Sequence, residues 1–326
     1  MPNNPQLAKI VKIIRQYNNF LITAHIHPEG DAICSQLALL NLLKRMKKHV
    51  VIYNHDSVPD NLTFFKETRY IHTAVPRLTP EVVIVLDSPN LSRVGKVADY
   101  IRDKFIINID HHISNAYFGR INWVDRHASS ASEMIYLLIK RMHPVIDPQT
   151  AKLLYVGIMT DTGSFRYTNT SAYTHTIAAE LINCKISVED IYKNIYLNKT
   201  PPQIRLTAQV LLNLKRACHG KLVWSKITKN MLCHKGKNIA VPEDLIENIR
   251  QLQGTEVVVL FREMENNRIK VSMRSQAKVD VNKIAGFFKG GGHRLASGCV
   301  ISGSMDKVMR KVLAKVKQQA ALVKRS

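Results

Sequence analysis

Acidic and imidazole side chains follow the ends of several short apolar runs in this 326-residue sequence. The run at residues 20–24 is followed by His25-Ile26-His27-Pro28-Glu29-Gly30-Asp31, and the runs at 82–86 and 105–109 are followed by Asp87 and by Asp110-His111-His112. A helical pattern that ends at Met159 leads into Thr160-Asp161-Thr162-Gly163. A single carboxylate in such a place is usually a helix cap or a turn residue. Four such places along one chain predict a shared site.

The residues at these four places are of the kinds that hold metal ions. Carboxylates gathered at one edge repel one another, so divalent cations are their natural counter-charge. Imidazole and carboxylate ligands without thiolate suit Mn²⁺, with Mg²⁺, Co²⁺ and Fe²⁺ as further candidates. Two such ions about 3.5 to 4 Å apart would hold a bridging hydroxide and the oxygens of an in-line displacement at phosphorus. The sequence therefore predicts a two-metal hydrolase of phosphoesters.

The elements between these places decide whether the four can meet. Residues 20–24, 50–53, 82–86 and 105–109 are continuous apolar runs without alternation, as expected for strands that are covered on both faces. Helical spacing over 32–47, 130–140, 150–159, 171–182 and 188–196 lies between and after them. This order predicts an α/β fold with a doubly wound, mostly parallel sheet. Ligands bind past the carboxyl ends of such strands, which is where the acidic groups lie.

A second, smaller unit follows the break at Thr200-Pro201-Pro202. Residues 203–215 resume a helical pattern, which we interpret as a connection between two bodies. Strand-like runs at 221–227, 255–262 and 268–274, a glycine-rich loop at 290–292 and a basic amphipathic helix at 305–323 predict an α+β domain. We therefore expect a catalytic domain over residues 1–195, a helical linker over 196–215 and a second domain over 216–326.

Composition limits the class of protein. With 47 Lys and Arg against 25 Asp and Glu, the net charge is 47 − 25 = +22, which favours polyanionic partners. Hydrophobic residues make up 45%, which excludes a disordered chain, and no apolar run approaches the roughly 18 residues of a membrane span. The start lacks the features of a secretion signal, so we expect a cytoplasmic protein. Its five scattered cysteines predict ordinary buried thiols, neither disulfides nor a zinc knuckle.

Longer motifs enclose the residues described so far. In the first domain they are His25-x-x-Pro28-Glu29-Gly30-Asp31-Ala32, Asp87 with Arg93 and Gly95, Asp110-His111-His112 and Gly157-Ile158-x-Thr160-Asp161-Thr162-Gly163-x-Phe165. In the second they are Val271-Ser272-x-Arg274-Ser275 and Gly290-Gly291-Gly292-His293-x-x-Ala296-Ser297-Gly298. Their order over nearly the whole chain resembles the DHH phosphoesterase superfamily with its DHH-associated C-terminal domain. The resemblance implies phosphoester hydrolysis.

The resemblance also implies a role for each motif residue. One metal ion would be held by His25, Glu29 and Asp87, and a second by Asp31, Asp87, His111 and Asp161, so that Asp87 bridges the two. The catalytic residues implied are Asp87, His112, which would stabilise charge on a phosphate oxygen, and Asp110, which would orient the histidines. The substrate-binding residues implied are Arg93, Arg274, Ser275, Gly290, Gly291, Gly292 and His293. Domain 216–326 is then expected to bind substrate.

The two-domain length resembles the small bacterial branch of nanoRNases and pAp phosphatases. This implies hydrolysis of very short oligoribonucleotides (nanoRNA) to mononucleotides and of 3′-phosphoadenosine 5′-phosphate (pAp) to AMP, by a hydroxide activated between two metal ions, preferably Mn²⁺. A phosphodiesterase of linear or cyclic di-AMP is an alternative with the same layout. An RNA-binding module with a degraded active site is an alternative of another class. A homodimer is left open.

Three features depart from this pattern. Glu29 stands where the superfamily usually has aspartate, and its extra methylene moves the carboxylate by about 1.5 Å, so the first metal is expected to be held differently or more weakly. His27 fits the motif spacing less well than His25, and its side chain is expected to face the substrate cleft or the solvent. His55-Asp56 could suggest an HD-type phosphohydrolase, but the further histidines that such a site needs are not at matching spacings.

Overall fold

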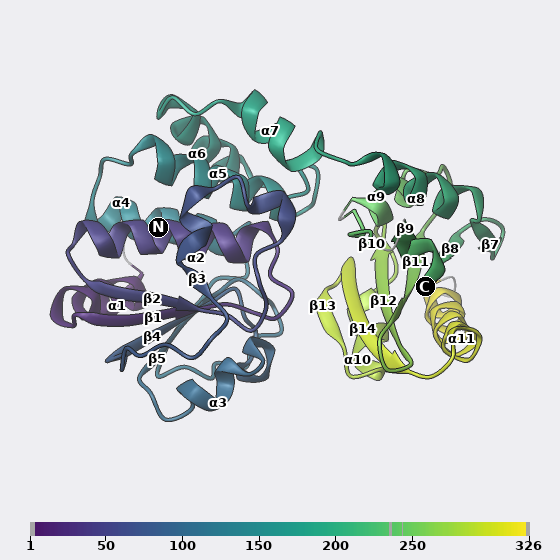
Figure 1. Cartoon of the computed structure of the whole chain (residues 1–326), viewed down its shortest axis with the longest axis horizontal. Helices are drawn as coiled ribbons and strands as arrows, with labels where there is room; N and C mark the ends of the chain where they lie inside the picture. Colours follow the sequence, from purple (N-terminus) through teal and green to yellow (C-terminus); the bar gives the residue numbers. More distant parts are fainter. Residues whose placement is uncertain (1–3, 235–236, 243, 324–326) are drawn as a thin grey trace. The chain divides into compact units, whose positions relative to one another are not determined.

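The computed structural model describes residues 4–234, 237–242 and 244–323. The chain divides into two compact units, Met1–Asn198 and Lys199–Ser326, and each is described by itself (Figure 1). The division falls three residues after the expected end of the catalytic domain.

The first unit is built on a six-stranded sheet in the order β3-β2-β1-β4-β5-β6, and every neighbouring pair is parallel. The strands are β1 (Asn19–Thr23), β2 (His49–Tyr53), β3 (Ile71–His72), β4 (Val82–Leu86), β5 (Ile106–Asp110) and β6 (Ile121–Val124). Every residue of β4 and β5 is buried, which is why these strands lack alternation in the sequence. The predicted parallel α/β sheet is confirmed.

Helices cover both faces of this sheet. They are α1 (Pro5–Gln16), α2 (Gly30–Arg45), α3 (Val97–Ile101), α4 (Ala131–Met142), α5 (Pro148–Asp161), α6 (Ala172–Asn183) and α7 (Val188–Tyr196). The core on one face contains apolar residues of α1, α2, α4 and α5, and the smaller core on the other face contains those of α3. The short 3₁₀ segments are η1 (Asp60–Leu62), η2 (Lys66–Tyr70) and η3 (Leu91–Val94).

The helices that carry the site begin at capping residues. Ser130 accepts a hydrogen bond from the N–H of Glu133 at the start of α4, and Asp147 accepts one from Thr150 at the start of α5. Pro148 occupies the first position of α5, where its missing N–H costs no helical hydrogen bond. These caps fix where α4 and α5 begin against the sheet.

The second unit has a mixed six-stranded sheet in the order β13-β14-β12-β11-β8-β7, in which only the pair β8 and β11 is parallel. Its strands are β7 (Lys215–Ala217), β8 (Leu222–Ile227), β11 (Val257–Met264), β12 (Arg268–Ser275), β13 (Gly291–His293) and β14 (Ala296–Ser302). A separate hairpin joins β9 (Cys233–His234) and β10 (Lys237–Asn238), and η4 (Asn230–Leu232) precedes it. The expected α+β class is confirmed.

Among the described residues of this unit, four helices pack on the sheet. Apolar residues of α10 (Val281–Phe287) and α11 (Met305–Val323) form the core on one face, and those of α8 (Pro201–Leu212) and α9 (Leu245–Arg250) form the core on the other. Helix α8 lies within the segment expected to link the domains. Because its Leu206 and Val210 are buried in the second core, α8 is part of the second unit.

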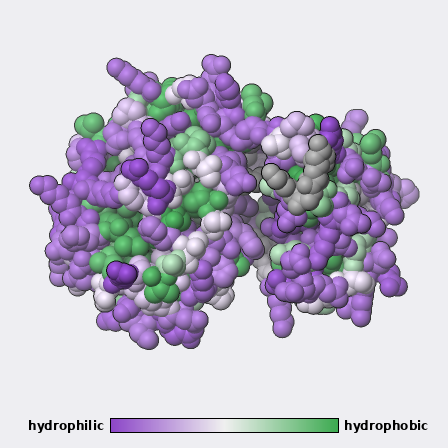
Figure 2. Space-filling model, in the orientation of Figure 1, coloured by the Kyte–Doolittle hydropathy of each residue, from purple (hydrophilic) through white to green (hydrophobic). Residues whose placement is uncertain are grey.

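The surface agrees with the composition. Hydrophilic residues cover most of the face seen in Figure 2, with apolar groups scattered between them. Within the described ranges, none of the helices combines the length and the apolar character that a membrane crossing requires. All five cysteines are free; Cys34 and Cys299 are buried, but Cys233 is exposed, so the expectation of buried thiols is wrong for Cys233.

Candidate metal centre

Asp87 lies at the centre of the clustered side chains. It directly follows β4, and its N–H donates to the carbonyl of Ile109 at the end of β5 (3.0 Å). Its φ of 52° lies in the left-handed region, which costs a residue with a Cβ about 1 to 2 kcal/mol. The side chain is buried. Strain of this kind, held by the neighbouring strand at the carboxyl edge of a sheet, is typical of a functional site.

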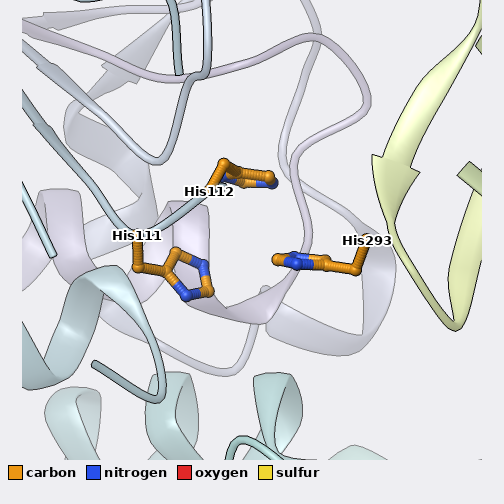
Figure 3. Close-up of side chains that lie close together, drawn as sticks. All are labelled: His111, His112 and His293. Carbon is orange, nitrogen blue, oxygen red and sulfur yellow. The ribbon is translucent and has the colours of Figure 1, made fainter. Parts of the chain in front are cut away.

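Three imidazoles surround the Asp87 carboxylate. His25 Nε2 lies 3.3 Å from Oδ2, His111 Nε2 lies 3.4 Å from Oδ1, and His112 Nδ1 lies 3.6 Å from Oδ1. The rings of His111 and His112 lie edge to face, with centroids 5.0 Å apart, on the segment after β5 (Figure 3). The ends of β1, β4 and β5 thus meet, as the order of the sheet requires.

Two further carboxylates reach the same cluster from helices. Asp161 is the last residue of α5, and its Oδ2 lies 3.6 Å from His111 Nε2. Asp31, His111 and Asp161 each present one atom within 4.8 Å of the others. Asp31 is in the first turn of α2, and its two oxygens accept hydrogen bonds from the N–H groups of Ala131 (2.7 Å) and Ser132 (2.8 Å). The start of α4 therefore fixes the Asp31 carboxylate.

Hydrogen bonds orient two of the imidazoles. His25 Nδ1 lies 2.7 Å from the carbonyl of Ile26, to which it donates, and this contact turns its Nε2 toward Asp87. His112 Nδ1 lies 2.7 Å from Asp110 Oδ1, and Asp110 Oδ2 accepts from Asn115 Nδ2 at 2.6 Å. Asp110 thus contacts one of the two histidines that the resemblance implies it would orient. The contribution of Asn115 was not foreseen.

Burial and neighbouring charge shift the pKa values of the cluster. Burial, supported by the charges of Asp87 and Asp161, raises the pKa of Asp31 well above its usual range, and burial raises that of Asp161 to about 6. For Asp87 the effect of burial is outweighed by His111 and His25, which hold its pKa well below the usual range. Burial opposes protonation of His111, but Asp161 and Asp87 outweigh it and raise its pKa well above 6.5. The raised pKa values of Asp31 and Asp161 thus reflect burial together with repulsion from the neighbouring carboxylates.

This donor set fits a divalent cation. Two ligand atoms that each lie about 2.1 Å from an ion are about 3.0 to 3.4 Å apart when the ligand–ion–ligand angle is a right or a tetrahedral angle. The Nε2 atom of His25 lies 3.3 Å from Asp87, and that of His111 lies 3.4 Å from Asp87 and 3.6 Å from Asp161, which is close to this range. Imidazole nitrogens and carboxylate oxygens suit Mn²⁺ and similar ions, and the buried carboxylates favour a positive charge beside them. Metal binding is therefore consistent with both the spacing and the chemistry of the cluster.

In the second unit, Arg274 is held by an acidic partner. Its Nε donates to Glu247 Oε1 on α9 (2.8 Å), and its Nη1 donates to the carbonyl of Met273 (3.2 Å). The other oxygen of Glu247 accepts from Arg250 at 3.1 Å. Ser275 is buried, and its hydroxyl donates to Glu256 Oε1 (3.0 Å). The alternation of β12 therefore places Arg274 and Ser275 on opposite faces of the sheet.

The glycine-rich loop joins α10 to the hairpin of β13 and β14. A Cβ at Gly290 would lie 2.2 Å from the carbonyl oxygen of Gly298, and one at Gly292, where φ is 140°, would lie 2.5 Å from that of Ala296. Nothing lies within 4 Å of a Cβ at Gly291. The first and third glycines are thus required by the close approach of the two strands, and the second leaves open space.

Comparison with known proteins identifies the family. Residues 19–158 match the model of the DHH family, N-terminal domain, and residues 223–322 match that of the DHHA1 domain. The chain is 30% identical over 315 residues to the bifunctional oligoribonuclease and PAP phosphatase NrnA of Thermus thermophilus, covering 96% of this chain and 93% of the relative. The chain belongs to the DHH family of phosphoesterases. The Bacillus subtilis protein of the same name is also 30% identical, over 90% of this chain and 93% of its own.

A crystal structure has the same fold as this DHH-family protein. An exopolyphosphatase-related protein from Bacteroides fragilis superposes with a TM-score of 0.87 at 28% identity, covering 98% of this chain and 97% of the other. The matched DHH region contains the clustered residues other than Asp161, and the matched DHHA1 region contains Arg274 and the glycine-rich loop.

Two residues that the sequence predicted for the site lie at its margin in this DHH-family protein. Glu29 is exposed at the N-cap of α2, and within the described ranges its side chain makes no hydrogen bond or ion pair. Its charge contributes to the raised pKa values of His25 and Asp161, so it lies within electrostatic range. Arg93 is also exposed, and its carbonyl accepts from the N–H of Ile26 (2.7 Å).

Proposed function

We propose that this protein hydrolyses very short oligoribonucleotides to mononucleotides and pAp to AMP, with two divalent cations, preferably Mn²⁺, as cofactors. The observation that carries the proposal is the cluster of three imidazoles and buried carboxylates around Asp87. The substrate class is supported by the relatives named as oligoribonuclease and PAP phosphatase, which match this chain over more than nine-tenths of their length.

The geometry supports the proposed ligands other than Glu29, which is proposed from its motif position alone. His25, Glu29 and Asp87 would hold one cation, and Asp31, Asp87, His111 and Asp161 the other. When bound, such cations activate water and neutralise charge at phosphorus. Asp87 has both its oxygens near imidazoles that would share these ions, which suits a bridging ligand. The α4 N–H groups hold Asp31 in place without the help of a metal ion.

The remaining polar groups would act on the substrate directly. Asp110 holds Nδ1 of His112 and so fixes the orientation of that ring, which would stabilise charge that develops on a phosphate oxygen. Arg93, Arg274 and His293 would contact the substrate, and the open backbone at Gly291 suits close approach of a phosphate or a base. Residues 1–195 would thus form the catalytic domain and 216–326 the substrate-binding domain.

Two general properties support this assignment. The net charge of +22 favours a polyanionic substrate. Five free thiols favour a reducing compartment, so we place the protein in the cytoplasm. The intact cluster around Asp87 favours a hydrolase over a module that only binds RNA.

The test is turnover of four substrates with Mn²⁺ and identification of the products: a diribonucleotide, pAp, cyclic di-AMP and a long single-stranded RNA. We expect the first two to be converted to mononucleotides and AMP, and Asp87→Ala to abolish turnover while the melting temperature shows a folded protein. Turnover of cyclic di-AMP alone would show that the proposed substrates are wrong. Tight binding of RNA without turnover of any substrate would show that the protein is not the proposed hydrolase.

A further inference from the structure

His55-Asp56 is the one motif pair from the sequence that the proposed function does not use. It follows β2, which pairs in parallel with β1, so the segments after both strands lie at the same edge of the sheet. His55 Nδ1 accepts a hydrogen bond from the N–H of Lys96 (3.0 Å), and its ring leaves no room for a Cβ at Gly95. This pair therefore holds loops together in the described structure, in place of an HD-type metal site.

Asp56 binds the loop that carries His25. Its Oδ2 accepts a hydrogen bond from the backbone N–H of His27 at 2.7 Å. His27 has a φ of 54°, in the left-handed region that a residue with a Cβ rarely adopts unless its surroundings hold it there. On the other side, the N–H of Ile26 donates to the carbonyl of Arg93 at 2.7 Å. The loop is thus anchored at two successive N–H groups.

One peptide unit connects Asp56 to the metal ligand. The N–H of His27 and the carbonyl of Ile26 belong to the same planar trans peptide, so they point in opposite directions. Asp56 holds the N–H end, and the carbonyl end accepts the Nδ1 proton of His25 at 2.7 Å. The proton on Nδ1 leaves Nε2 unprotonated in the neutral ring, and Nε2 lies 3.3 Å from Asp87.

We propose that Asp56 is a positioning residue for His25: through the peptide between Ile26 and His27 it fixes the Nδ1 tautomer and points Nε2 at the cation site. Partners that orient a ligating histidine commonly change metal affinity when removed. The inference rests on the proposed cation site, and it concerns the backbone of His27. The His27 ring is largely exposed (54%), and its Nδ1 lies 3.6 Å from Asp56 Oδ2, so His27→Ala tests whether the ring contributes.

The first experiment measures Mn²⁺ affinity without substrate, from the electron paramagnetic resonance signal of free Mn²⁺. We expect Asp56→Ala to weaken binding by about 10- to 100-fold. Asp56→Asn keeps an acceptor oxygen and should stay within about threefold of the wild type. His27→Ala keeps the N–H and should do the same. The matched control is Asp60→Ala, which removes an exposed carboxylate four positions further along the chain, at the start of η1.

Three outcomes would overturn the positioning role. These are wild-type affinity in Asp56→Ala, an equal loss in Asp56→Asn, or a loss in His27→Ala as large as that in Asp56→Ala. A second measurement needs no variant: ¹⁵N spectra of the metal-free wild type should show a proton on Nδ1 of His25, which donates to the carbonyl of Ile26, and an Nδ1 without a proton would contradict the proposal. A wild type that binds no Mn²⁺ would instead overturn the proposed function.

Discussion

Gly157 lies so close to Ser132 that a Cβ atom at position 157 would come within 1.9 Å of the serine hydroxyl oxygen and 3.0 Å of Asp31 Oδ1. This contact is where α5 meets the start of α4 and the Asp31 carboxylate that the start of α4 holds. The absence of a side chain at one helical position thus allows a carboxylate on α2 to lie against the N-terminus of α4.

Gly157→Ala is therefore expected to disturb both stability and metal binding. Overpacking of this kind costs about 1 to 3 kcal/mol, even though alanine favours helix more than glycine does. Denaturant unfolding of the protein treated with a chelator measures the stability, and Mn²⁺ titration measures metal binding. Gly286→Ala is the control, because nothing lies within 4 Å of a Cβ at this position of α10. If Gly157→Ala were as stable as Gly286→Ala and bound Mn²⁺ normally, the close contact would have no consequence.

Asp161 predicts a pH dependence of the metal-free protein. Burial raises its pKa from 3.8 to about 6, so the folded state holds this proton more tightly than the unfolded chain does. The stability that the protonated Asp161 side chain contributes is complete below about pH 4 and is lost as the pH rises through 6. Asp161→Asn lacks this titration. With chelator present, we expect the variant to gain stability relative to the wild type between pH 4 and 7.

The measurement is the difference between the two unfolding free energies at each pH. This difference removes the titration of groups distant from Asp161, and it includes the change at Asp31 and His111, whose pKa values the charge of Asp161 raises. Mn²⁺ should reverse the order at pH 7.5, because the wild type keeps a ligand that the variant lacks. A difference that stays constant from pH 4 to 7 would contradict the raised pKa, and equal stabilisation of both proteins by Mn²⁺ would contradict the ligand role.

The elements that the sequence predicted well are those whose hydrophobic pattern can be read from a few consecutive residues. The run at 82–86 is β4 residue for residue, and the amphipathic pattern at 305–323 is α11 with the same bounds. Strand β6 was not predicted, because Trp123 is its only buried residue and no apolar run marks it. Helix α1 was also missed, although Leu7, Ile10, Val11 and Ile14 have helical spacing after the capping residue Asn4.

The sequence predicted the site contacts that follow from the order of the strands, but it did not predict those that depend on how helices pack on the sheet. Because the ends of parallel strands must meet, the neighbours of Asp87 followed from strand order. The partners of these residues did not: Glu247 is 27 positions from Arg274, and only the packing of α9 on β12 brings them together. The separation of Arg274 from Ser275 had a signal in the sequence, since Ile269, Val271 and Met273 alternate with polar residues and indicate the inward face.

Glu247 yields a prediction for substrate binding, if Arg274 contacts the substrate as proposed. Glu247→Ala removes the hydrogen bond that holds Nε of Arg274, while the hydrogen bond from Nη1 to the carbonyl of Met273 stays. We expect KM for a diribonucleotide to rise about tenfold, the equivalent of one charge-assisted hydrogen bond of about 1.4 kcal/mol, with kcat less affected. Steady-state kinetics at saturating Mn²⁺ measure both constants. Glu265→Ala, which removes an exposed carboxylate paired with Lys229, should leave KM unchanged. A lower KM in Glu247→Ala would show that the carboxylate masks the guanidinium and does not position it.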